Sequence, residues 1–201
     1  MKFSSRFSSK IFRRSFISAA AFLFACIPFA VQADYQAKQA DYRINLYDTD
    51  TSKCQTFTAG YRTLAGLVCI RPDRDFLEVT YATVDGWELV ETNFWIGAGN
   101  TPAEAGMPAD KQGHPEVGSF LYTSGDITGE TEHVFYISLD DAFGKKEICD
   151  ITGVLTGHAL VRKDYGDGNY QTEVGWIDGT PINRNFDWAM FSSINFTCTD
   201  R

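Results

Sequence analysis

The residues best suited to binding chemistry lie in one alternating segment, residues 87–96. Every second side chain of a strand projects to the same face, so five of them form one row: Trp87, Leu89, Glu91, Asn93 and Trp95. Indole rings stack on pyranose faces, and carboxylate and amide groups hydrogen-bond to sugar hydroxyls. If the other face of the strand is the core, the row predicts a carbohydrate-binding surface, which Trp176 and Trp188 could extend. The alternative is that the row itself is core, because a register shift of one residue exchanges the two faces.

His158 is a further candidate ligand-binding residue. It lies between small residues in a later predicted strand, where it could meet Glu91 or Asn93 from another strand. Imidazole nitrogen and carboxylate oxygen together can bind a transition metal. The alternative is a hydrogen-bonded structural histidine without a ligand.

Glu78 and Glu91 are the best candidates for a general acid and base, because they lie on neighbouring predicted strands. A glycosidase-type pair needs two carboxylates about 5 to 10 Å apart, one of them with a raised pKa. In a chain with 26 acidic residues, however, two can share a surface by chance. The sequence contains no phosphate-binding glycine loop, no Gly-x-Ser-x-Gly elbow and no paired-histidine zinc motif. An enzyme is therefore the less favoured hypothesis, and no residue is assigned as catalytic.

The segment from Asp164 to Asn169 is rich in oxygen ligands and glycine. Asp164, Asp167 and Asn169 could bind calcium through their side-chain oxygens. The spacing differs from that of an EF-hand, and the same residues are typical of a turn that needs no metal. No cofactor is expected from the sequence, and calcium at this loop is the alternative.

Four cysteines follow residues 1–33, a segment with the pattern of a signal peptide that is described below. An even number of cysteines in an exported chain indicates two disulfides. We expect the pairs Cys54–Cys69 and Cys149–Cys198, although four cysteines allow three pairings. Each bond would stabilise the fold by about 3 to 4 kcal/mol in the chain-entropy model. A zinc site is disfavoured because no two cysteines have the close spacing that such sites use.

The elements that must position these residues are short alternating segments separated by Gly, Pro, Asp and Asn. The clearest strands are 76–83 and 87–96, and Asp85-Gly86 between them is a strong signal for a hairpin turn. One helical turn is predicted within 139–148, and further strands are predicted at 43–47, 56–61, 64–70, 117–122, 131–139, 156–161, 171–177 and 188–196. This pattern predicts a single all-β domain, an antiparallel β-sandwich of the jelly-roll or immunoglobulin-like kind.

Three segments carry distinctive motifs: residues 59–68 (AGYRTLAGLV), 76–83 (FLEVTYAT) and 85–92 (DGWELVET). Over residues 59–162 the chain resembles a poorly characterised β-domain family of exported microbial proteins. The resemblance implies export and a β fold, and it implies no activity. Members of that family often carry two histidines, two residues apart, after the Glu-Thr pair. This chain has Asn93 and Trp95 there, which speaks against a metal role for that strand.

Residues 1–33 have the pattern of a cleaved signal peptide, with a basic start, an apolar run over 16–31 and small residues before the cut. The apolar run is shorter than the roughly 20 residues of a membrane anchor. Residues 34–201 would then form the single exported domain, located outside the cell or in the periplasm. Its 13 basic and 26 acidic residues give a net charge of −13, which argues against nucleic acids and anionic membranes as partners.

These patterns support one leading hypothesis and two alternatives. The leading hypothesis is a secreted, non-catalytic β-sandwich that binds a carbohydrate or another cell-surface or matrix ligand. The first alternative is a structural protein of an extracellular matrix that self-associates through sheet edges. The second is a polysaccharide hydrolase or lyase.

Overall fold

The computed structural model describes residues 42–45, 52–60, 63–73, 75–144, 148–183 and 188–198. The predicted signal peptide, residues 1–33, lies outside the described residues. Every described residue belongs to one compact unit, residues 38–201.

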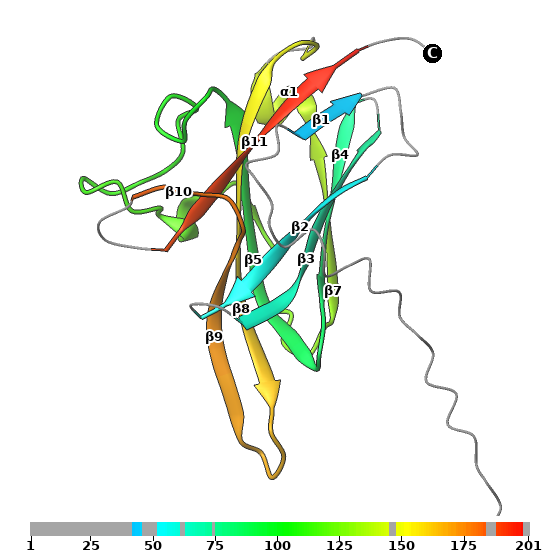
Figure 1. Ribbon diagram of the computed structural model, residues 1–201, viewed down its shortest axis with the longest axis vertical. Coiled ribbons are helices and arrows are strands. Elements are labelled where there is room, and N and C mark those ends of the chain that lie inside the picture. The colour runs from blue at the N-terminus through cyan, green and yellow to red at the C-terminus, as the bar shows by residue number, and fades with distance from the viewer. Residues whose placement is uncertain are drawn as a thin grey trace, which may run out of the picture. The chain divides into compact units, whose positions relative to one another are not determined.

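The described residues form a nearly all-β fold, as the sequence predicts (Figure 1). The strands are β1 (Tyr42–Asn45), β2 (Lys53–Ala59), β3 (Thr63–Asp73), β4 (Phe76–Thr83), β5 (Trp87–Ala98), β6 (Tyr122–Thr123), β7 (Glu132–Ser138), β8 (Thr152–Asp164), β9 (Tyr170–Ile177), β10 (Thr180–Pro181) and β11 (Met190–Thr197). A short 3-10 helix, η2 (Val117–Ser119), and a short α-helix, α1 (Leu139–Phe143), interrupt them. Among the described residues, no helix is long and apolar enough to cross a membrane.

Strand β8 is the centre of the hydrogen-bond network. One edge of β8 pairs with β5 along nearly its whole length, and the other edge pairs first with β11 and then with β9. From β9 the sheet continues through β2, β3 and β4 to β7. The pairs are antiparallel, as predicted, except that β1 runs parallel to β11, which makes the sheet mixed. A division into the two sheets of a sandwich stays a prediction.

Alternation along β4 locates the main core. Leu77, Val79 and Tyr81 are fully buried, whereas Glu78 between them is partly exposed. The buried side chains of β4 belong to one hydrophobic cluster with those of β3, β5, β7 and β8. Within it, the Tyr81 hydroxyl donates a hydrogen bond to the backbone oxygen of Asn93 on β5 at 2.9 Å. Strands β4 and β5 therefore face each other across the core.

Asp85 and Gly86 form the predicted turn but not the predicted hairpin. Both residues have positive φ, 54° and 77°, and the Trp87 amide donates to the Val84 carbonyl, as in a tight type I′ turn. However, β4 pairs with β3 and β7, while β5 pairs with β6 and β8. Both edges of β4 are occupied, so β5 has no edge of β4 to pair with. The turn instead carries the chain across the core.

A second, smaller apolar cluster covers the opposite face of β5 and β8. Trp95 of β5 belongs to it, and Val117 and Phe120, from the connection between β5 and β6, pack there as well. A strand was expected over 117–122, but this segment begins with the 3-10 helix η2 and only its last residue is in a strand. The three-residue spacing of Val117 and Phe120 puts both side chains on one face of a 3-10 turn. Packing against the cluster therefore favours the turn over a strand.

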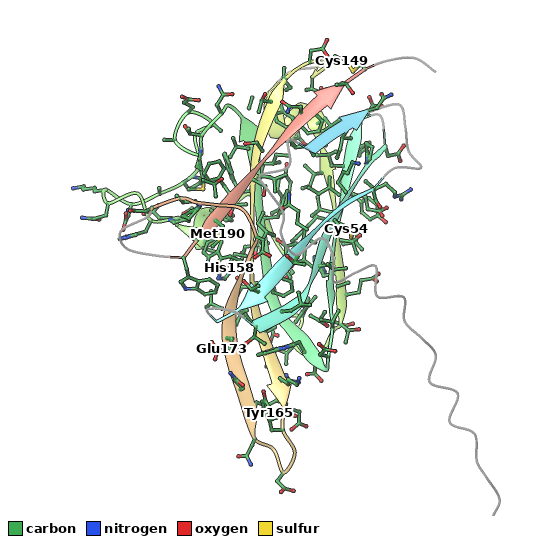
Figure 2. All side chains as sticks on the ribbon, viewed as in Figure 1. Cys54, Cys149, His158, Tyr165, Glu173 and Met190 are labelled. Carbon is green, nitrogen blue, oxygen red and sulfur yellow. A yellow bond between two sulfur atoms is a disulfide. The ribbon has the colours of Figure 1, made fainter. Side chains whose placement is uncertain are left out.

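Both predicted disulfides are present, and one cysteine of each is labelled in Figure 2. Cys54 and Cys69 face each other across β2 and β3, with Cα atoms 3.9 Å apart. Cys149 precedes β8 and Cys198 follows β11, so their bond joins the ends of two paired strands. Each bond therefore fastens a strand pair that backbone hydrogen bonds also hold.

Candidate functional site

The predicted row on β5 is divided between the two faces of the strand. A β-bulge between Leu89 and Glu91 adds one residue relative to β8, which reverses the alternation. Trp87 and Leu89 point into the main core, and the other three residues of the row lie on the opposite face. Trp87 and Trp95 are only 2% and 7% exposed. The expectation of two solvent-facing tryptophans on one surface is therefore wrong.

Three of the predicted residues meet on that opposite face, and we call them the polar cluster: Glu91, Asn93 and His158. Asn93 of β5 lies directly across from His158 of β8. Asn93 Nδ2 donates a hydrogen bond to Glu91 Oε1 at 2.9 Å and lies 3.3 Å from His158 Nδ1. Of the two neighbours that the sequence offered for His158, Asn93 is thus the one in direct contact.

The surroundings of His158 keep its imidazole neutral. Burial lowers the pKa of His158 to about 4, against the opposing effect of the Glu91 charge. Because Asn93 Nδ2 is a donor, Nδ1 of the imidazole accepts and the ring proton lies on Nε2. The ring of Trp176 on β9 packs edge-on against the imidazole, with centroids 4.8 Å apart. Trp176 is itself buried, so it extends the cluster by packing and not as an open sugar-stacking ring.

The polar cluster has the character of a buried structural network. Asn93 is almost completely buried, and its Oδ1 has no hydrogen-bond partner among the described groups. One imidazole and one carboxylate are fewer ligands than a stable metal site uses. In the described part of the chain, no group of three or more His, Cys, Asp or Glu residues could hold a metal ion. Ligand binding by Glu91, Asn93 and His158 stays a prediction.

The segment expected to bind calcium is the tight loop between β8 and β9, where Tyr165 is labelled (Figure 2). Asp164 Oδ1 accepts a hydrogen bond from the Gly166 amide at 2.7 Å, and the Asn169 amide donates to the Gly166 carbonyl. Asp167 adopts the left-handed conformation, with φ of 54°. These hydrogen bonds close the turn by themselves. This fits the alternative stated above, that the segment is a turn that needs no metal. Calcium binding by Asp164, Asp167 and Asn169 stays a prediction.

Glu78 and Glu91 lie on opposite sides of the core. Glu78 is on the outer face of β4, and Glu91 faces away from the core on β5. These two best candidates for an acid–base pair therefore cannot form one, because the hairpin that would bring them together is not formed. The hydrolase or lyase hypothesis thereby loses its carboxylate pair.

An open depression lies on the outer face of β4 and its neighbours β3 and β7, and we call it the aromatic hollow. Asp73, Phe76, Glu78 and Tyr136 line it, and its volume is about 210 Å³. Phe76 is 46% exposed and Tyr136 is 72% exposed, so both rings are open to solvent. Pairing places Glu78 of β4 opposite Tyr136 of β7 and opposite Arg71 of β3. A cation, a carboxylate and a phenol thus form one cross-strand row.

Arg71 and Glu78 form an ion pair at the side of the hollow. Arg71 Nε donates to Glu78 Oε1 at 3.2 Å, and Nη2 donates to Oε2. The hydrogen bond and the charge of Glu78 raise the pKa of Arg71. No hydrogen bond or ion pair joins the Asp73 carboxylate to another side chain in the described part of the chain. The charge of Asp73 also acts on Arg71, but the Asp73 oxygens have no hydrogen bond to a described side chain and are available to a ligand.

The sequence interpretation missed the aromatic hollow. Phe76 and Tyr136 are far apart in the sequence and come together only because β7 pairs with β4. A signal was present, since Phe76 falls on the same face of its strand as Glu78, opposite the buried residues Leu77 and Val79. A single apolar side chain on an outer face is common, so Phe76 alone does not indicate a binding surface; only the pairing with Tyr136 makes a patch.

No protein-family model, curated protein or solved structure matches this chain. The resemblance of residues 59–162 to an exported microbial domain family stays a prediction.

Proposed function

We propose that this protein is an exported, non-catalytic β-protein that binds carbohydrate at the aromatic hollow. The supporting observation is that two exposed rings, Phe76 and Tyr136, lie beside the carboxylates of Asp73 and Glu78 in one depression. An aromatic ring offers an apolar face to the C–H groups of a pyranose, and carboxylates accept hydrogen bonds from its hydroxyls. Aromatic rings beside polar groups are the binding groups that the sequence predicts, but the proposed site lies on the outer face of β3, β4 and β7 and not on β5.

The size and openness of the hollow favour a short stretch of a long glycan over an enclosed small molecule. Its volume of about 210 Å³ is smaller than the roughly 300 Å³ at which enclosed ligand pockets begin. It includes a residue of β7, the last strand of the sheet order, so a chain can lie across the sheet edge. A shallow site binds one glycan segment weakly, and a polymer compensates by offering many equivalent segments.

Location outside the cytoplasm is part of the proposal. The two disulfides are of the kind that persist in oxidising compartments. The signal-peptide pattern of residues 1–33 points the same way. We therefore propose an extracellular or periplasmic protein.

Affinity electrophoresis in gels that contain a panel of polysaccharides tests the proposal. Tyr136→Ala removes the more exposed ring and should weaken retention about three- to tenfold, which corresponds to the loss of about 0.5–1.5 kcal/mol from one ring contact. The free energy of unfolding should change by less than about 0.5 kcal/mol, because the side chain is mostly in solvent. Tyr165→Ala is the matched control, because Tyr165 is 64% exposed and lies in the β8–β9 loop, outside the hollow.

Two results would contradict carbohydrate binding at the hollow. One is the absence of retention on every polysaccharide of the panel. The other is retention that falls equally in Tyr136→Ala and in the Tyr165→Ala control, which would place binding elsewhere or make it unspecific.

One observation favours the alternative of a self-associating structural protein. Strand β7 pairs with β4 along one edge, and no other described strand pairs with it. An unpaired edge can accept a strand from a second copy of the chain. Light scattering over a concentration series distinguishes this function: a mass that grows with concentration supports it, and a constant monomer mass excludes it.

A further inference from the structure

We infer that the aromatic hollow selects glycans that carry positive charge, namely chains of amino sugars with free ammonium groups. This inference rests on the proposed function, because it names the class of glycan that the same site takes. It follows from the charges of the hollow and from the two rings beside them.

The charges of the hollow do not cancel. Arg71 and Glu78 neutralise each other through two hydrogen bonds. Asp73 lies two residues after Arg71 in β3, so both side chains share the outer face of the sheet. The exposed Asp73 carboxylate then leaves one negative charge in the hollow. Residues 71–78 carry three acids and two bases, Arg74 included, so the whole segment is also negative.

The rings strengthen the attraction for a cation. An ammonium group above the face of a Tyr or Phe ring is attracted by the negative potential of that face. The protein uses this contact elsewhere, since the Arg162 guanidinium lies 4.5 Å from the ring centroid of Tyr170. In the hollow, Tyr136 and Phe76 present such rings beside a carboxylate. Ring and carboxylate together match a sugar that carries an ammonium group.

The same features disfavour two other occupants. Anionic polysaccharides are repelled by the Asp73 carboxylate and by the excess of 26 acidic over 18 basic residues in the chain. A basic peptide would also satisfy the carboxylate, and its arginine side chains could lie on a ring, but it carries its cations on flexible side chains whose ordering costs entropy on binding. A pyranose with an ammonium group uses both the rings and the charge.

The experiment compares two probes of equal length, a β-1,4-linked glucosamine hexamer and its fully N-acetylated counterpart. Titration calorimetry at about pH 6 and low salt should show about tenfold tighter binding of the glucosamine hexamer, since a cation–ring contact and an exposed ion pair each contribute a few-fold. Asp73→Asn removes the charge at constant size and should reduce this preference to about threefold, with unchanged affinity for the N-acetylated hexamer. Asp167→Asn, in the exposed β8–β9 loop, is the matched control and should keep the full preference.

The outcomes separate this inference from the proposed function. Equal affinity for the two hexamers, or a preference that Asp73→Asn and added salt leave unchanged, would overturn the charge selection while glycan binding stands. Binding of only neutral glycans from the wider panel would do the same. No binding of any glycan would overturn both. Tighter binding of a lysine hexamer than of the glucosamine hexamer would overturn the assignment to a glycan and identify a basic peptide as the ligand.

Discussion

Replacing His158 with Asn should make the stability of the protein less dependent on pH. In the folded wild-type chain, burial lowers the pKa of His158 to about 4. In the unfolded chain the imidazole has an ordinary pKa of about 6.5. Between these values the unfolded state binds more protons than the folded state, so stability falls as the pH drops below 6.5. Once the pH is below the folded-state pKa, the whole stabilisation that comes from keeping His158 neutral is lost.

The size of the effect follows from the two pKa values. The difference of about 2.5 pKa units lowers the free energy of unfolding by about 3 kcal/mol when the pH falls through both values. Between pH 7 and pH 5 the loss is about 2 kcal/mol. Asn carries no titrating charge, and its Oδ1 can accept the hydrogen bond from Asn93 that Nδ1 of the imidazole accepts now. The variant loses ring packing against Trp176 and is less stable at every pH, so the comparison concerns the pH dependence alone.

Urea unfolding of both proteins at pH 7 and pH 5 measures the effect. The wild-type protein should lose about 2 kcal/mol more than His158→Asn between these pH values. The carboxyl groups of Asp110 and Asp126 have lowered pKa values because of hydrogen bonds, and they destabilise both proteins equally as the pH falls. An equal loss in wild type and variant would refute the conclusion that folding buries His158 in its neutral form.

Three changes test the packing and the covalent links. Tyr81→Phe removes the buried hydrogen bond to the Asn93 carbonyl and should lower the free energy of unfolding by about 1–3 kcal/mol in urea denaturation. Gly157→Ala puts a Cβ atom 2.7 Å from the Tyr81 hydroxyl oxygen and 2.8 Å from Ile177 Cγ2. Gly157→Ala should lower the free energy of unfolding by about 1–3 kcal/mol, and by less in the Tyr81→Phe variant, which lacks the hydroxyl. Strictly additive effects of the two substitutions would contradict this contact. Replacing Cys149 and Cys198 together with Ser opens a loop with a sequence separation of 49. The double variant should be about 4 kcal/mol less stable, and an unchanged melting temperature would show that the β8–β11 pairing alone holds this end.

Local features of the fold could be predicted from the sequence. Strand β4 has the expected bounds, Phe76–Thr83, because its alternation and the flanking turn residues are properties of adjacent positions. The number of cysteines indicated two disulfides, and the structure selects the expected pairs from the three pairings that the number allows. For His158, which lies between small residues of a predicted strand, the sequence offered Glu91 or Asn93 as a neighbour, and β5 places Asn93 opposite it.

Features that depend on strand partners could not be predicted. The bulge after Leu89 exists only relative to β8, and nothing in residues 87–96 signals that one residue is extra. It moved Trp87 into the core and left Trp95 on the other face. The aromatic hollow depends in the same way on the pairing of β4 with β7, which joins Phe76 and Tyr136 from distant parts of the chain. Register and pairing are decided by the whole sheet, so a single segment does not contain them.

The position of β8 has a consequence for the order in which the chain can mature. In the hydrogen-bond order of the described strands, β5 and β6 connect to β2, β3, β4 and β7 only through β8 and β9. A ribosome makes β2 to β7 first, and until residues 152–177 emerge no strand pairing joins β5 and β6 to β2, β3, β4 and β7. Pairing between distant segments is slow because it requires closure of long loops. The complete sheet can therefore assemble only after β8 and β9 have been synthesised, late in the production of the chain.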